Sequence, residues 1–143
     1  MELKENIAEF LKSQPAITLA TENNGQPMAH PVVFASDGCT VYFITSSTSR
    51  KMDNISKNPK AAYSTYKNTM NWMETYSVQM EGVASVVSDE SEKQKAFGML
   101  MEKYPPMKDM EVQGDQAVVK IEPKLCFLSD YSKGFGHRDE INF

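Results

Sequence analysis

Short segments in which apolar and polar residues alternate recur along this chain of 143 residues, and they limit its possible folds more than any other feature. Alternation with a period of two is the pattern of a β-strand with one buried face. Closing such strands into a barrel removes exposed sheet edges. The pattern therefore predicts a mainly β fold, a β-barrel with short helices and six to seven antiparallel strands, at residues 16–21, 28–35, 40–44, 60–66, 76–87, 116–121 and 125–129.

The segments between these strands supply turns and short helices. Asn23-Asn24-Gly25 and Ser36-Asp37-Gly38 both favour tight turns, so the first third of the chain is predicted to be a three-stranded antiparallel meander. Gly82, within the longest strand, indicates a bulge where a barrel turns a corner. Apolar residues at helical spacing predict helices over 3–12 and 88–103, and a third short helix is predicted over 49–57.

The amino-acid composition restricts the classes of partner that the protein could bind. The chain has 15 Lys and Arg against 19 Asp and Glu, a net charge of −4, so no nucleic acid partner is expected. It begins with polar and acidic residues and has no apolar run of ~20 residues, which predicts a cytoplasmic protein with no membrane partner. Cys39 and Cys126 lack the spacing of a zinc site. We therefore predict no metal site, and we interpret both cysteines as buried apolar residues.

One domain is predicted for residues 1–143, because a chain of this length is most simply organised around a single core. The final segment, 130–143, is different in character from the rest. It combines two glycines with three aromatic residues and many charges, too apolar for a free tail and too glycine-rich for a helix. We expect it to be a C-terminal arm that packs over the barrel or over a partner subunit.

The segment 41–51 carries the clearest chemical signal. An apolar strand leads directly into a run of hydroxylated residues, which is followed by two adjacent cations and by the predicted helix over 49–57. Hydroxyls, cations and the free N–H groups of a helix N-terminus are the groups that bind phosphate. The alternative is a capped strand-to-helix loop with its cations in solvent. We name the set of these residues the candidate phosphate site: Thr45, Ser46, Ser49, Arg50 and Lys51.

Three segments, taken in order, resemble motifs of one protein family. Residues 24–33 read NGQPMAHPVV, residues 49–59 read SRKMDNISKNP, and residues 78–84 read VQMEGVA. In this order and spacing they are similar to the strand pair, the phosphate-binding segment and the later strand of the pyridoxamine 5′-phosphate oxidase-like, FMN-binding split β-barrel family. The resemblance extends over about residues 1–129.

The resemblance implies a cofactor, FMN, and assigns residues to it. It implies that the candidate phosphate site holds the FMN phosphate and that Gln79 faces the flavin. It implies a homodimer with the cofactor at the interface, in which Trp72 reaches the partner's flavin. The alternative is that Trp72 is an aromatic residue of the dimer core or of the barrel rim. The resemblance also implies that one strand runs beside the flavin ring, at His30, Pro31, Val32 and Val33. His30 is then either a proton donor near the ring or a hydrogen-bonded barrel histidine.

The function implied is that of an FMN-dependent oxidoreductase of this family, acting on an unidentified small-molecule substrate. The flavin would carry the chemistry, and no catalytic residue of the chain is identified. The ending YSKGFGHRD replaces the Arg/His signature of the vitamin B6 enzymes, which argues against a vitamin B6 substrate. The alternative is a non-catalytic flavin- or haem-binding protein on the same barrel, with His137 as an iron ligand. A deazaflavin or nitro-compound reductase is a third option.

Overall fold

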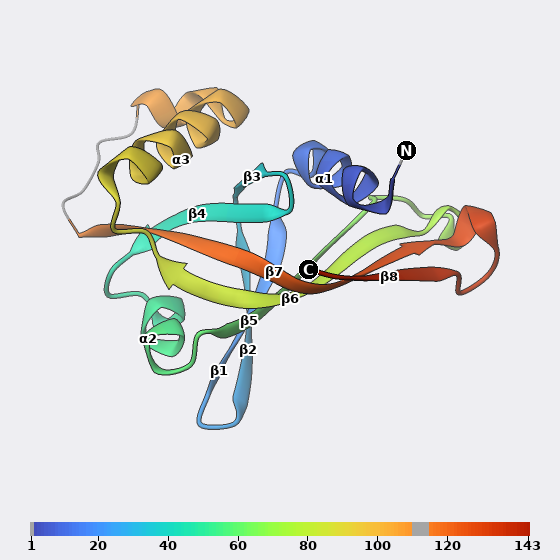
Figure 1. The fold of residues 1–143 in the computed structure, drawn as a ribbon, viewed down its shortest axis with the longest axis horizontal. Coiled ribbons are helices and arrows are strands. Elements are labelled where there is room, and N and C mark those ends of the chain that lie inside the picture. Colours follow the sequence, from blue (N-terminus) through green and yellow to red (C-terminus); the bar gives the residue numbers. More distant parts are fainter. Residues whose placement is uncertain (1, 110–114) are drawn as a thin grey trace.

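The chain folds into a strongly curved antiparallel sheet with helices over its ends (Figure 1). The computed structural model describes residues 2–109 and 115–143. Within these residues the α-helices are α1 (Leu3–Ser13), α2 (Arg50–Lys57) and α3 (Glu90–Lys103), and the 3₁₀ helices are η1 (Trp72–Glu74), η2 (Pro105–Asp109) and η3 (Tyr131–Lys133). The strands are β1 (Ile17–Asn23), β2 (Gln26–Val32), β3 (Ala35–Asp37), β4 (Thr40–Ser46), β5 (Lys60–Tyr66), β6 (Tyr76–Val86), β7 (Gln116–Asp130) and β8 (Arg138–Asn142).

The strand order is β2-β1-β5-β6-β7-β4-β3, with β8 also paired to β7. The described residues therefore form eight strands where the alternation predicted six to seven. The two predicted strands at 116–121 and 125–129 are halves of β7, whose first half pairs with β4 and whose second half pairs with β8. β3 and β8 are new. β3 has three residues, too few to show a period, and β8 reads RDEIN, with a single apolar residue and therefore no alternation. β8 lies in the predicted arm and attaches it to the sheet.

The predicted three-stranded meander is wrong in its pairing. β1 and β2 form the expected hairpin, and β3 and β4 form another, but β4 pairs with β7 and not with β2. The reason is a corner after Val32, where Val33 is 44% exposed and Phe34 is fully buried. This corner sends the chain to the far side of the sheet. In the sequence, residues 28–35 have the pattern of one continuous strand, so the change of direction at Val33 could not be predicted from the alternation.

Gly82 is a bulge, as predicted. The register of β6 against β7 shifts between Glu81 and Gly82. A Cβ atom at position 82 would lie 2.5 Å from the carbonyl oxygen of Glu122 and 2.8 Å from Cγ2 of Ile121. The two strands approach so closely here that only glycine fits.

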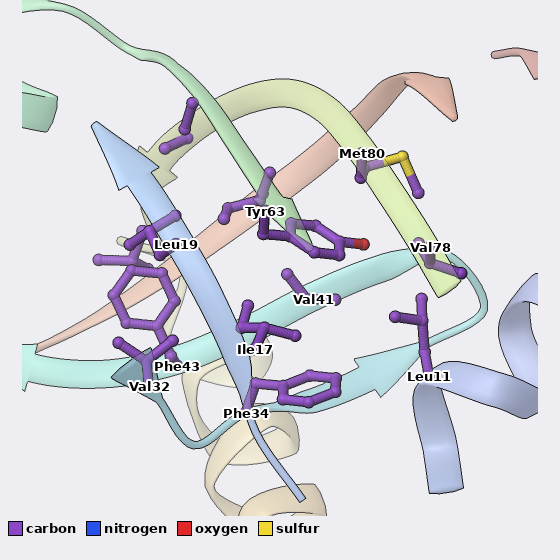
Figure 2. Close-up of a cluster of buried hydrophobic side chains, with 14 of the residues drawn as sticks. Leu11, Ile17, Leu19, Val32, Phe34, Val41, Phe43, Tyr63, Val78 and Met80 are labelled. Carbon is purple, nitrogen blue, oxygen red and sulfur yellow. The ribbon is translucent and has the colours of Figure 1, made fainter. Parts of the chain in front are cut away.

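The core lies inside the curved sheet, beneath α1 and beside α2 (Figure 2). Phe34, Phe43 and Leu19 are fully buried in it. The hydroxyl of Tyr63 is buried among these side chains with no hydrogen-bond partner in the described part of the chain, and Figure 2 shows it pointing toward the side of the cluster where Val78 and Met80 lie. Cys126 is buried as predicted, whereas Cys39 is only half-buried. No α-helix among the described residues is long and apolar enough to cross a membrane.

Candidate functional site

The loop after β4 is shaped by the cap of α2. Ser49 precedes the helix with extended backbone, and its Oγ accepts a hydrogen bond from the N–H of Met52 over 3.2 Å. Thr45 is buried at the end of β4, and its Oγ1 donates to Ser49 Oγ over 3.0 Å. These two hydroxyls therefore fix the helix start. The N–H groups of Arg50 and Lys51, in the first turn, have no partner within the helix and are available to an anion.

The two cations at this helix start form no ion pair with another described residue. Arg50 is exposed and Lys51 is half-buried. Among the described residues, neither has a carboxylate oxygen within 4.0 Å. The Arg50 guanidinium instead contacts the sulfur of Met28 on β2, with Nη2 at 3.6 Å from Sδ. Two unpaired positive charges at a helix N-terminus, where the helix dipole adds to them, favour an anionic ligand.

A cleft of about 430 Å³ opens beside these charges, between α2 and the β1–β2 hairpin. Its walls carry both polar and apolar side chains. The side-chain oxygen of Asn23 is buried there and has no hydrogen-bond partner among the described residues, so it is free to accept from a ligand. The lining residues are Asn23, Met28, Ser47, Thr48, Ser49, Arg50, Met52, Asp53, Asn54 and Ser56.

Ser46, the remaining predicted member of the candidate phosphate site, is engaged within the protein. Its Oγ donates to the carboxylate of Asp115 over 3.2 Å and lies 2.9 Å from Thr48 Oγ1. The N–H of Ser47 also bonds to the backbone carbonyl of Asp115 over 2.6 Å. Ser46 therefore holds the loop in place, and the members of the candidate phosphate site left to donate directly to an anion are Arg50 and Lys51, together with the backbone.

His30 lies behind the candidate phosphate site, on the inner face of β2. Its Nε2 is 2.9 Å from Thr21 Oγ1, which also accepts from the amide nitrogen of buried Asn54 over 2.9 Å. Burial lowers the pKa of His30 below its usual range, and the nearby charges of Lys51 and Arg50 lower it further. The imidazole is therefore neutral at neutral pH. This geometry fits the interpretation of His30 as a hydrogen-bonded barrel histidine.

Thr21, Asn54 and Met28 were missed by the sequence reasoning. Asn54 is 2% exposed on the buried side of α2, where its amide donates to Thr21 and to the Met28 sulfur. The signal was an asparagine placed between Met52 and Ile55 in a helix, since a polar residue on an apolar helix face must find partners.

Of the other predicted flavin-lining residues, Pro31 and Gln79 face the opposite side of the sheet. Pro31 pairs with Thr18, Thr18 with Ser64, and Ser64 with Gln79, so all four lie in one row across β2, β1, β5 and β6. All four are exposed, and we call this side the outer face. Three strand spacings separate Pro31 from Gln79, about 14 Å. Val33 is exposed just beyond β2, while Val32 points into the core.

Trp72 is not brought to the candidate phosphate site. It lies in η1, in the connection between β5 and β6, at the end of the sheet opposite α2 (Figure 1). It is 59% exposed and makes an edge-on contact with Phe135, with ring centroids 5.3 Å apart. Phe135 in turn contacts Tyr131, with centroids 5.6 Å apart. These two residues belong to the predicted arm, so the arm and the Trp72 loop form one exposed aromatic cluster.

Comparison with known proteins gives the same fold and a family. The family model described as pyridoxamine 5′-phosphate oxidase matches residues 3–129. General stress protein 26 of Bacillus subtilis (strain 168) is 24% identical over 123 residues, which cover 86% of this chain and 85% of that protein. The structure of general stress protein 26 from Bacillus anthracis is similar with a TM-score of 0.76 at 20% identity, with 100% of both chains covered.

A haem-binding protein from Mycobacterium smegmatis is similar in structure, with a TM-score of 0.82 at 18% identity. The match covers 99% of this chain but only 59% of that protein. The family match spans most of the sequence, and the chain belongs to the pyridoxamine 5′-phosphate oxidase family. The predicted split barrel is confirmed by the same structural similarities. In the described ranges, no group of three His, Cys, Asp or Glu side chains could hold a metal ion.

Proposed function

We propose that this protein is an oxidoreductase that binds FMN and uses it to oxidise or reduce a small molecule. One observation carries the proposal: Arg50 and Lys51 stand at the N-terminus of α2 with no carboxylate partner among the described residues, and Arg50 lines a cleft of about 430 Å³. This arrangement suits one terminal phosphate. The chain has no G-x-G-x-x-G turn of the kind that holds a dinucleotide, so FMN is favoured over FAD.

Each group of the site would have a distinct task. Arg50, Lys51 and the first N–H groups of α2 would bind the phosphate, while Thr45, Ser46 and Ser49 keep the loop in shape. The backbone from His30 to Val33 would lie along the ring. When bound, FMN supplies hydride and electron transfer, and the protein contributes position and exclusion of water.

A homodimer is part of the proposal. Gln79 and Trp72 are both remote from the candidate phosphate site of their own chain, so a flavin bound there would meet them only if a second copy supplied them. The outer face suits such packing because alanines on three adjacent strands, Ala29, Ala20 and Ala62, are paired neighbours. A depression of about 730 Å³ on the same face adds shape for a partner.

The test begins with the purified protein. Heat release of the cofactor, with chromatography against standards, should yield FMN. FAD would contradict the proposal, and so would the absence of any flavin from protein refolded with excess FMN. Oxidoreductase activity is tested separately, by anaerobic reduction of the bound flavin with NADH or NADPH followed by reoxidation with candidate acceptors. A flavin that dithionite reduces, but that neither nucleotide reduces and that passes its electrons to none of the acceptors, would indicate a carrier.

Substitution of the two cations tests the location of the phosphate. Arg50→Ala combined with Lys51→Ala should raise the Kd for FMN at least ~10-fold, because hydrogen bonds to a charged group each contribute roughly 1.5–3 kcal/mol and exposure reduces that. Lys12→Ala combined with Lys108→Ala removes the same charge from exposed positions elsewhere and should leave the Kd unchanged. An unchanged Kd for FMN in the variant that combines Arg50→Ala with Lys51→Ala would place the phosphate at another site.

A haem-binding function is the second candidate, and one contact favours it. His137 Nε2 lies 3.2 Å from a carboxylate oxygen of Asp139, in the segment between η3 and β8. Histidines that ligate metals usually pair their other nitrogen with a carboxylate, which leaves Nδ1 for iron. Titration with haem separates the candidates. A sharp Soret band that disappears in His137→Ala would support haem, whereas no Soret band beside stoichiometric FMN would exclude it.

A further inference from the structure

Two hydrogen bonds join His30 to the helix that carries the candidate phosphate site. His30 Nε2 and the Asn54 amide nitrogen both lie 2.9 Å from Thr21 Oγ1. Thr21 is 4% exposed and Asn54 is 2% exposed, so the bond between them is shielded from water, while His30 itself is only part-buried. The imidazole is therefore fixed at one distance from the N-terminus of α2.

The field at this imidazole is positive. Arg50 Nη2 lies 3.6 Å from Sδ of Met28, which is two residues from His30 on the same face of β2. The charges that act on His30 are those of Lys51 and Arg50, and the carboxylates on the neighbouring elements are Asp53 on α2 and Glu22 on β1. Asp53 is paired with Lys57 over 3.1 Å, and Glu22 accepts hydrogen bonds from Asn58 and from the backbone of Gly25. Arg50 and Lys51 have no such partner among the described residues, and their charges, together with burial, lower the pKa of His30.

We propose that anion binding at the candidate phosphate site is linked to proton uptake by His30. A bound dianion cancels part of the field of Arg50 and Lys51, which removes a cause of the repulsion that keeps His30 neutral. The coupling is reciprocal, so a protonated His30 must also favour the anion. The inference rests on the proposed function for its anion, and it makes His30 a positioning residue whose charge tunes the affinity of the site.

The pH dependence of the affinity for the anion follows from the pKa of His30 in the free and in the bound protein. The pKa of His30 in the free protein lies below its usual value of 6.5, and binding raises it. Affinity then increases as the pH falls through the pKa of the bound state, and the gain is complete below the pKa of the free state. Each unit by which binding raises the pKa corresponds to a tenfold gain in affinity.

Nuclear magnetic resonance of the unmodified protein gives the direct measurement. The chain has only 2 histidines, and His137→Gln identifies which imidazole resonance belongs to His30. The pKa of His30 is measured with and without saturating sulfate, which stays dianionic across the relevant pH range. We expect a higher pKa with sulfate than with the same ionic strength of sodium chloride. An equal pKa in the two salts would overturn the inference.

Affinity for FMN gives a second measurement. The phosphate of FMN has its own pKa near 6, so affinity will change with pH in any variant. His30→Gln keeps a hydrogen-bonding side chain but cannot be charged. The ratio of the Kd of His30→Gln to that of the wild type should increase about threefold to tenfold from pH ~8 to pH ~5. A ratio that does not change with pH would contradict the linkage.

Failure of the proposed function and failure of the linkage give different results. If the wild type does not bind FMN at any pH, the proposed function fails, and the sulfate titration still decides the linkage because it needs only an anion. If FMN binds but neither the His30 pKa nor the affinity ratio responds, the site stands and the linkage is wrong.

Discussion

The buried hydroxyl of Tyr63 is an unusual residue-level feature. It has no hydrogen-bond partner among the described residues, and burial raises the pKa of this phenol. An unpaired buried hydroxyl costs free energy, so Tyr63→Phe should leave the free energy of unfolding unchanged or raise it by up to about 1 kcal/mol. Tyr42→Phe is the matched control, since Tyr42 donates to Glu92 over 2.8 Å and its loss should cost about 1 kcal/mol.

Urea unfolding of both variants measures these changes. Destabilisation by Tyr63→Phe equal to that of Tyr42→Phe would mean that the Tyr63 hydroxyl has a partner in solution, such as a bound water.

Lys103 makes stability depend on pH. Its ammonium lies 3.7 Å from the Phe34 ring centroid, and burial lowers its pKa from 10.5 to about 8. The folded chain therefore holds this charge less readily than the unfolded chain does, and the unfolded chain binds more protons between these values. The contribution of Lys103 to stability should rise as the pH increases from about 8 to about 10.5.

The comparison is with Lys103→Met, measured by urea unfolding at both ends of this range. The wild type should gain stability relative to the variant as the pH rises. Lys60→Met, at an exposed position of β5, serves as the control and should show a constant difference. A constant difference for Lys103→Met as well would show that the ring contact, and not burial, governs the lysine.

At the scale of the elements, the β6 bulge should be the least tolerant position. Gly82→Ala places a methyl group against the backbone of β7, at 2.5 Å from the Glu122 carbonyl, and the strands must separate to admit it. We expect a loss of about 2 kcal/mol or more in the free energy of unfolding. Gly98→Ala is the control, because Gly98 lies in α3 with open space around it, and alanine there should add roughly 0.5–1 kcal/mol.

Both changes are measured by chemical unfolding. Equal effects of the two substitutions would contradict the close approach of β6 and β7.

The sequence predicted local features of these elements better than their partners. The Gly82 bulge was predicted, and a capped loop before α2 was the alternative interpretation of segment 41–51, because a bulge glycine and a capping residue act on neighbouring residues. The pairing of β4 with β7 was not, because it depends on contacts far along the chain. The same limit applies to the site. Period two assigns His30 and Pro31 to opposite faces, but only the assembled sheet shows that His30 points toward α2 and Pro31 outward.

At the scale of the whole molecule, the proposed dimer makes a direct prediction. Ala20→Glu introduces a charge at the centre of the outer face, between Ala29 and Ala62, and should convert a dimer into a monomer and weaken FMN binding. Gln94→Glu adds the same charge on an exposed part of α3 and should change neither. Light scattering should report about twice the chain mass of 16.1 kDa for the wild type and for Gln94→Glu.

A wild-type monomer that holds one FMN per chain would contradict this proposal. A dimeric Ala20→Glu variant would instead show that the interface lies on another surface.

The two-sided pairing of β7 has a consequence for synthesis on the ribosome. β4 is translated early, yet its ladder is completed only by β7, whose Ile121 pairs with Val41. Until β7 emerges, the apolar side chains of β4 lack their final neighbours, and the nascent chain depends on chaperones or on speed to avoid self-association. Pairing over such long stretches of chain also favours refolding in milliseconds to seconds and not in microseconds. A strand translated about 70 residues after β4 is thus the one that completes its ladder.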